Sequence, residues 1–134
     1  MISVMAGGIA VLVAGTAWLQ LGWLVVTVIG PSMQPTLRPG DHLLVRRRPI
    51  RRIRAGQIVV LDTDHELIIK RVAAVPGDPV PSGLDLCSAD RVPAGRLVLL
   101  GDNTNSSIDS RTHGYYDGAC LVGVAVRTPP RSGT

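Results

Sequence analysis

The stretch ELIIKRVAAV, residues 66–75, is a short apolar run rich in Ile, Val and Ala, and the turn sequence PGDPVP follows it. Four further runs have the same character: DHLLVRR, GQIVVLDT, GRLVLLGD and ACLVGVAV. Gly, Pro or Asp bounds each of them, which is typical of strands separated by turns. Their even spacing predicts a mostly β domain over residues 30–127, a small β-sheet or partly open barrel. The polar residues 128–134 are expected to form a flexible tail.

The sequence before this domain is strongly apolar, since residues 1–37 contain no Asp, Glu, Lys, Arg or His. Residues 6–29 are almost wholly apolar, and about 20 apolar residues in a helix can cross a bilayer. We therefore expect one N-terminal transmembrane helix at 6–29, after a short tail of residues 1–5. A cleaved signal peptide is the alternative, but the segment lacks a basic start and a clear Ala-x-Ala site.

Arginine supplies most of the positive charge, and six arginines lie between Arg46 and Arg54. This run is either a solvated hairpin tip or a surface that contacts anionic lipid. Nucleic-acid binding is disfavoured because no recognition helix or aromatic platform accompanies the charge. Two cysteines, Cys87 and Cys120, could pair in an oxidising compartment or remain free buried thiols.

Lys70 is the single lysine of the chain and lies inside the apolar run 66–75. Strand alternation places Lys70 on one face with Ile68 and Val72, and Arg71 on the other. One of these two cations is therefore expected to face apolar side chains. One interpretation is that Lys70 lies on an edge strand, where its charge would only prevent aggregation. A buried lysine, unlike arginine, can lose its proton and act as a base.

Ser32 lies in GPSMQPTL, a loop sequence between the apolar segment and the first charged residues. A serine nucleophile needs a base. His42, His65 and His113 are available in the chain, but no sequence pattern ties any of them to Ser32. The nucleophile-elbow pattern G-x-S-x-G is also absent around Ser32. The loop LGDNTNSSIDSRTHGYYDG, residues 100–118, is polar and follows a predicted strand directly.

Three of these stretches together resemble the bacterial type I signal peptidases, or leader peptidases. GPSMQPTL (30–37) is similar to the nucleophile box of that family, KRVAAVPGD (70–78) to its general-base box and GDNTNSSIDSR (101–111) to its third box. The order of the three motifs also matches. The short segment between the second and third boxes resembles that of a near-minimal member.

The resemblance implies a Ser-Lys dyad protease, with Ser32 as nucleophile and Lys70 as general base. It implies that Ser107 orients Lys70 and that Asp109 and Arg111 form a structural pair. The oxyanion would be bound mainly by backbone N–H groups in the region of Gly30 and Ser32, because Gly30 offers no hydroxyl. Candidate substrate-pocket residues are Met33, Pro35, Leu37, Asp102 and Asn103. No metal and no cofactor is expected.

The implied substrates are secreted preproteins that are cut after small residues at positions −1 and −3. A dedicated peptidase of the same family, with one leader peptide, pilin-like or conjugation protein as substrate, is an alternative. A non-catalytic lipid-binding β module tethered to the membrane is another. The resemblance places the protein in the cell membrane as a single-pass protein, with a cytoplasmic N-terminus and an extracytoplasmic catalytic domain. The arginine run alone would favour a cytoplasmic domain.

Overall fold

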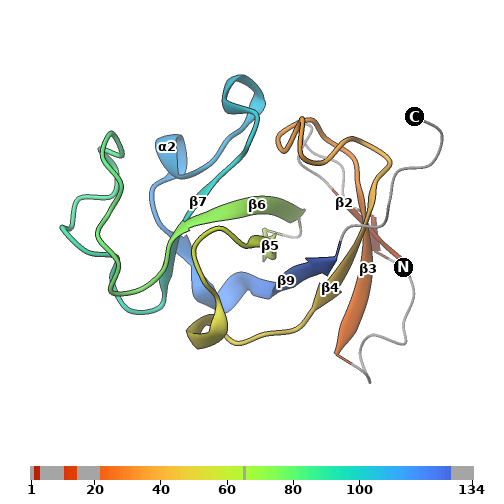
Figure 1. The fold of residues 1–134 in the computed structure, drawn as a ribbon, viewed down its shortest axis with the longest axis horizontal. Coiled ribbons are helices and arrows are strands. Elements are labelled where there is room, and N and C mark those ends of the chain that lie inside the picture. The colour runs from red at the N-terminus through yellow and green to blue at the C-terminus, as the bar shows by residue number, and fades with distance from the viewer. Residues whose placement is uncertain (1, 4–10, 15–21, 65, 128–134) are drawn as a thin grey trace.

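Strands are the main secondary-structure elements in the computed structural model, which describes residues 2–3, 11–14, 22–64 and 66–127. The strands, drawn in Figure 1, are β1 (Ile2–Ser3), β2 (Val11–Ala14), β3 (Trp23–Val28), β4 (His42–Arg46), β5 (Ile58–Thr63), β6 (Glu66–Ala74), β7 (Arg96–Leu100), β8 (Tyr116–Asp117) and β9 (Leu121–Arg127). The helical elements are single turns: η1 (Ile50–Arg52), η2 (Thr104–Ser106), α2 (Ser110–His113) and η3 (Gly118–Cys120).

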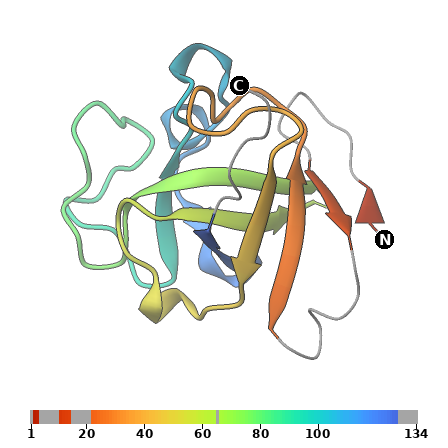
Figure 2. The ribbon, with the colours of Figure 1, turned by 45° about the vertical axis from the view of Figure 1, so that its right-hand side comes forward.

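The strands form one antiparallel sheet in the order β1-β2-β3-β4-β9-β5-β6-β7-β8. The sheet curls, as the contact of β2 with β6 across it shows. In Figure 2, β3 and β4 run across β5 and β6. The mostly β prediction is confirmed. The five runs that the sequence predicts as strands correspond to β4, β5, β6, β7 and β9.

The helix expected over residues 6–29 is not what the described part of that segment forms. Residues 11–14 and 23–28 are strands β2 and β3, and the rest of the segment before Gly22 lies outside the described residues. In β3 the side chains of Leu24, Val26 and Val28 are buried while Val25 is exposed, and residues 23–27 pair with β4. This alternation suits a half-buried strand and explains the difference. Among the described residues, no helix is long and apolar enough to cross a membrane.

Strand β6 occupies the middle of the fold, between β5 and β7. Its side chains enter two core clusters on opposite faces. Ile69 packs with the side chains of β3 and β4, whereas Ile68 and Val72 pack with those of β5, β7 and β9. Because both faces are covered, a polar side chain in this strand can be withdrawn from water.

The two ends of the molecule carry different features. The loop between β3 and β4 and the loop after β7 lie side by side at one end in both Figure 1 and Figure 2. The arginine-rich turn η1 lies at the other end, where β3 begins. The long axis of β3 therefore connects the arginine-rich end with the loop that contains Ser32.

Candidate active site

Two loops meet around Ser32. We call residues 29–41 the Ser32 loop and residues 101–109 the β7 loop. The backbone N–H of Asn103 donates to Ser32 O at 2.8 Å, and its side-chain Nδ2 donates to Pro31 O at 3.0 Å. Ser32 itself is 4% exposed. The β7 loop thus holds the backbone on both sides of the Ser32 amide nitrogen.

The Ser32 loop is anchored in the core by two of its own side chains. Met33 and Leu37 are each 1% exposed and pack in the cluster formed by β3, β4 and Ile69. The Leu37 N–H donates to Met33 O at 2.9 Å, which closes a tight turn, and Pro35 in that turn is exposed. The assignment of these three residues to a substrate pocket stays a prediction.

Lys70 is the largest fully buried side chain, with 0% exposure. Among the described residues, none hydrogen-bonds its Nζ. Burial lowers the pKa of Lys70 to about 8, against the opposing effect of the nearby Asp109 carboxylate; Arg111 lowers it further, and Glu66 raises it. Of the two adjacent cations, Lys70 is therefore the one inside, and its lowered pKa means that it loses its proton more readily than an ordinary lysine.

Asp109 is the polar centre of the β7 loop, with 0% exposure. Its Oδ2 accepts from the Gly101 N–H and from Ser107 Oγ, each at 2.8 Å. Arg111 donates to both carboxylate oxygens through its side chain, so the expected Asp109–Arg111 pair is present. Burial raises the pKa of Asp109, but the hydrogen bonds from Arg111, Gly101 and Ser107 outweigh it and hold the pKa below its ordinary value.

Ser107 donates its hydroxyl hydrogen to Asp109 rather than to Lys70. Since a hydroxyl also carries acceptor lone pairs, Ser107 can still receive a hydrogen bond from an ammonium group. The role of Ser107 in orienting Lys70 stays a prediction.

Gly101 lies against Ser107 of the β7 loop and the backbone of Ser32. A Cβ built on Gly101 would lie 2.0 Å from Ser107 Oγ and 2.8 Å from Ser32 O. These separations are far below van der Waals contact, so only glycine allows the two serine residues to approach each other here.

Substitution Gly101→Ala is therefore expected to lower the free energy of unfolding by about 3 kcal/mol, as overpacking does in tight interiors. Urea denaturation followed by circular dichroism measures the loss. Ser106→Ala, an exposed position in the same loop, is the matched control and should change stability by less than about 0.5 kcal/mol. An unchanged unfolding midpoint for Gly101→Ala would show that the loops are not in close contact.

A second ion pair ties the Ser32 loop to β6. Arg71 Nε and Nη2 donate to the two oxygens of Asp102 at 2.9 and 2.8 Å. Thr36 Oγ1 donates to Asp102 Oδ2 at 2.5 Å. The hydrogen bond from Arg71 holds the pKa of Asp102 below its ordinary value, although burial opposes this. Asp102, expected in the substrate pocket, thus joins the residue after Lys70 to the Ser32 loop; the pocket assignment itself stays a prediction.

The sequence reasoning missed Arg71 and Thr36 as parts of this site. The adjacency of Arg71 to Lys70 in β6 was a usable signal, because the residue after a buried one points to the opposite face. Thr36 gave no such signal, since its partner lies 66 residues further along the chain.

The described histidines have partners away from Ser32. His42 Nδ1 lies 2.9 Å from Thr27 Oγ1, and the His113 ring stacks on Tyr116 with centroids 4.3 Å apart. His65 lies outside the described residues. The two cysteines are free thiols, with Cys87 buried and Cys120 partly exposed. In the described part of the chain, His42 and His113 thus have partners other than Ser32, and the role of Lys70 as the base stays a prediction.

The burial of Lys70 has a cost that a substitution can reveal. Below its folded pKa of about 8 the buried ammonium is disfavoured, and the cost disappears as pH rises from that value toward the ordinary 10.5. Lys70→Met is expected to raise the free energy of unfolding at pH 7 by about 3 kcal/mol. Chemical denaturation at pH 7 and pH 9.5 measures it. The gain in the free energy of unfolding should be smaller at pH 9.5 than at pH 7. Equal gains at both pH values would mean that burial of the Lys70 ammonium does not lower stability.

The chain matches a known protein family over most of its length. A family model described as "Signal peptidase, peptidase S26" matches residues 1–83 and 81–128 of the chain. The chain belongs to this signal peptidase family. The resemblance to type I signal peptidases is thereby confirmed, and Ser32, Lys70 and the β7 loop all lie in the matched ranges.

Curated relatives of this signal peptidase family member come from mitochondria and bacteria. Mitochondrial inner membrane protease subunit 1 of Xenopus tropicalis is 41% identical in an alignment of length 108 that covers 74% of this chain and 64% of that protein. Mitochondrial ATP-independent inner membrane protease subunit 1b of Arabidopsis thaliana is 36% identical in an alignment of length 96 that covers 63% of this chain and 57% of that protein. Signal peptidase I V of Bacillus subtilis (strain 168) is 28% identical in an alignment of length 134, gaps included, that covers 72% of this chain and 80% of that protein.

The chain thus spans less than two thirds of the length of the first two of these relatives.

Proposed function

We propose that this protein is a serine endopeptidase that removes signal peptides from secreted preproteins by a Ser32–Lys70 dyad. The observation that carries the proposal is the complete burial of Lys70, whose pKa falls to about 8, beside the loop that binds Ser32. A buried amine with no hydrogen-bond partner among the described residues is costly. A role of Lys70 as the catalytic proton acceptor would explain why the protein keeps a buried amine despite its cost in stability.

The first step uses neutral Lys70. Ser32 Oγ attacks the scissile carbonyl carbon while Lys70 Nζ takes the hydroxyl proton. The carbonyl oxygen becomes an oxyanion. The backbone N–H of Ser32 belongs to the same residue as the nucleophile, and in this proposal it stabilises the oxyanion. Gly30, which is buried, adds no side-chain donor, so this stabilisation rests on the backbone. Lys70 then returns its proton to the leaving amine, and the peptide bond breaks to give an ester on Ser32.

The second step releases the acyl group. Lys70, neutral again, removes a proton from a water molecule that attacks the ester carbonyl, and the proton returns to Ser32 Oγ as the ester bond breaks. Ser107 supports both steps in this proposal, since its acceptor lone pairs can direct the ammonium hydrogens. Asp109 fixes Ser107 by accepting its hydrogen bond at 2.8 Å.

The substrate class in the proposal is a preprotein with small residues at positions −1 and −3. Membership of the signal peptidase family supports it. Membrane association is included because several relatives are named inner membrane proteases, and because residues 6–21 carry no charged side chain. The catalytic domain is placed on the extracytoplasmic side, where preproteins of this class emerge.

Cleavage of a purified preprotein with an Ala-x-Ala site tests the proposal. The full chain in detergent should release the mature protein, with mass spectrometry locating the cut after the second Ala. Replacement of the −1 Ala of the substrate by Leu should slow cleavage by about 100-fold, because an added isobutyl group does not fit a pocket shaped for a methyl. No cleavage of the parent substrate, or equal cleavage of both, would contradict the proposed function.

A further inference from the structure

We propose that an arginine-lined cleft at the end of the molecule opposite Ser32 binds the phosphate groups of anionic membrane lipids. The cleft has a volume of about 690 Å³ and lies between the η1 turn and strand β9. We call it the arginine cleft. Its lining residues are Arg48, Arg51, Arg52, Arg54, Gln57, Val124, Ala125 and Val126.

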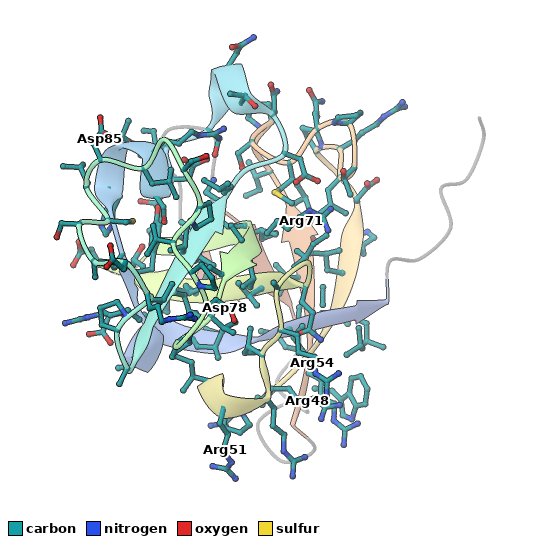
Figure 3. All side chains as sticks on the ribbon, turned by 60° about the vertical axis from the view of Figure 1, so that its left-hand side comes forward. Arg48, Arg51, Arg54, Arg71, Asp78 and Asp85 are labelled. Carbon is teal, nitrogen blue, oxygen red and sulfur yellow. The ribbon has the colours of Figure 1, made fainter. Side chains whose placement is uncertain are left out.

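The cleft gathers positive charge without a counter-charge. The described residues of its lining include four arginines and no acidic residue. Within the part of the chain that the structure describes, the ion pairs are formed by Arg71, Arg96 and Arg111, and no cleft arginine takes part in one. Figure 3 shows Arg48, Arg51 and Arg54 together at one end, away from Arg71. Four like charges around one hollow repel each other, and an anion between them removes that repulsion.

Guanidinium groups are suited to phosphate in particular, because their planar N–H fork binds two phosphate oxygens at once. The short turn η1 presents Arg51 and Arg52 as exposed neighbours. On the opposite wall, Val126 of β9 is 44% exposed. A cationic cleft with an apolar margin fits an anionic headgroup attached to an acyl chain better than it fits a free inorganic ion.

The position of the cleft favours a membrane over other polyanions. The backbone N–H of Arg47 donates to Gly22 O at 2.9 Å, directly after the uncharged sequence 6–21. The Arg46 guanidinium lies 5.1 Å from the Trp23 ring centroid. Tryptophan and arginine side chains are characteristic of the membrane–water interface. Among the described residues that line the cleft, none has an aromatic ring on which a nucleotide base could stack.

Hydrogen–deuterium exchange on the full chain in lipid nanodiscs tests this inference. Backbone amides of residues 48–54 and 124–126 should exchange about fivefold more slowly or better in phosphatidylcholine discs with 30% phosphatidylglycerol than in phosphatidylcholine alone. The difference should vanish in 0.5 M NaCl. The readout does not involve peptide cleavage, so it succeeds or fails independently of the proposed function.

Two double variants carry the same loss of charge. Arg51→Gln/Arg52→Gln removes two cleft arginines and should abolish the protection by anionic lipid. Arg38→Gln/Arg91→Gln removes two exposed arginines outside the cleft and should keep it. Equal protection in both disc types, or equal loss in both variants, would overturn the inference. So would equal protection in neutral discs by 10 mM inorganic phosphate or by a DNA oligonucleotide, since either result would make lipid unnecessary.

Discussion

Lys70→Arg is expected to reduce kcat/KM for preprotein cleavage by about 10³-fold or more, the size of effect that a general base supplies. Arginine keeps the positive charge and much of the length of lysine, but it does not release its proton in proteins. Ser32→Ala should cost at least as much, because it removes the attacking oxygen. The double variant Ser32→Ala/Lys70→Arg should be no slower than the slower single variant, since the two groups act as one unit. Steady-state cleavage assays measure all three.

The pH profile separates a base from a structural lysine. Wild-type kcat/KM should rise about tenfold per pH unit below pH 8 and level off above it, because the neutral amine of a lysine with a pKa of about 8 is the active form. Lys70→Met, which replaces the buried ammonium by an apolar chain, provides a folded comparison if Lys70→Arg fails to fold. Full activity in Lys70→Met, or a flat wild-type profile between pH 6 and 8, would show that Ser32 uses another base.

Asp109→Ala is expected to lower the free energy of unfolding by about 3–5 kcal/mol, as the removal of one partner from a buried ion pair does. The change leaves the Gly101 N–H, the Ser107 hydroxyl and the Arg111 guanidinium without their acceptor. Chemical denaturation measures the loss. Asp85→Ala, at an exposed position, is the control and should stay within about 0.5 kcal/mol of wild type.

The same carboxylate predicts an acid dependence. Because the folded pKa of Asp109 is held below its ordinary value, its contribution is present above about pH 4 and is lost as pH falls through the folded pKa. The stability gap between wild type and Asp109→Asn should therefore narrow in acid. A gap that stayed constant from pH 7 to pH 3 would mean that the charge of Asp109 is not what stabilises the loop.

Strands β4, β5, β6, β7 and β9 could be predicted because each is a short apolar run bounded by turn signals. Strand β3 could not, since its apolar residues follow directly on an uncharged segment and hydropathy alone does not separate a strand from the end of a helix. What makes residues 23–28 a strand is pairing with β4, a contact that is formed only in the folded chain.

The apolar neighbours in sequence predicted that either Lys70 or Arg71 is buried, and the resemblance to signal peptidases implied the Asp109–Arg111 pair. The link from Arg71 through Asp102 to Thr36 could not be predicted, because its members lie 31 and 66 residues apart. Local patterns report which face a side chain occupies. They do not report which distant loop packs against that face.

The length of strand β3 sets the distance between the two ends of the molecule. The six residues of the strand, at about 3.3 Å each, separate the arginine-rich end from the beginning of the Ser32 loop by about 20 Å. With the arginine cleft resting on lipid headgroups and β3 upright on the membrane, Ser32 would lie above the membrane surface by roughly that distance. A preprotein would then need about six residues of extended chain between the bilayer surface and its cleavage site. The length of β3 would then restrict the substrates to preproteins whose cleavage sites project about this far from the membrane.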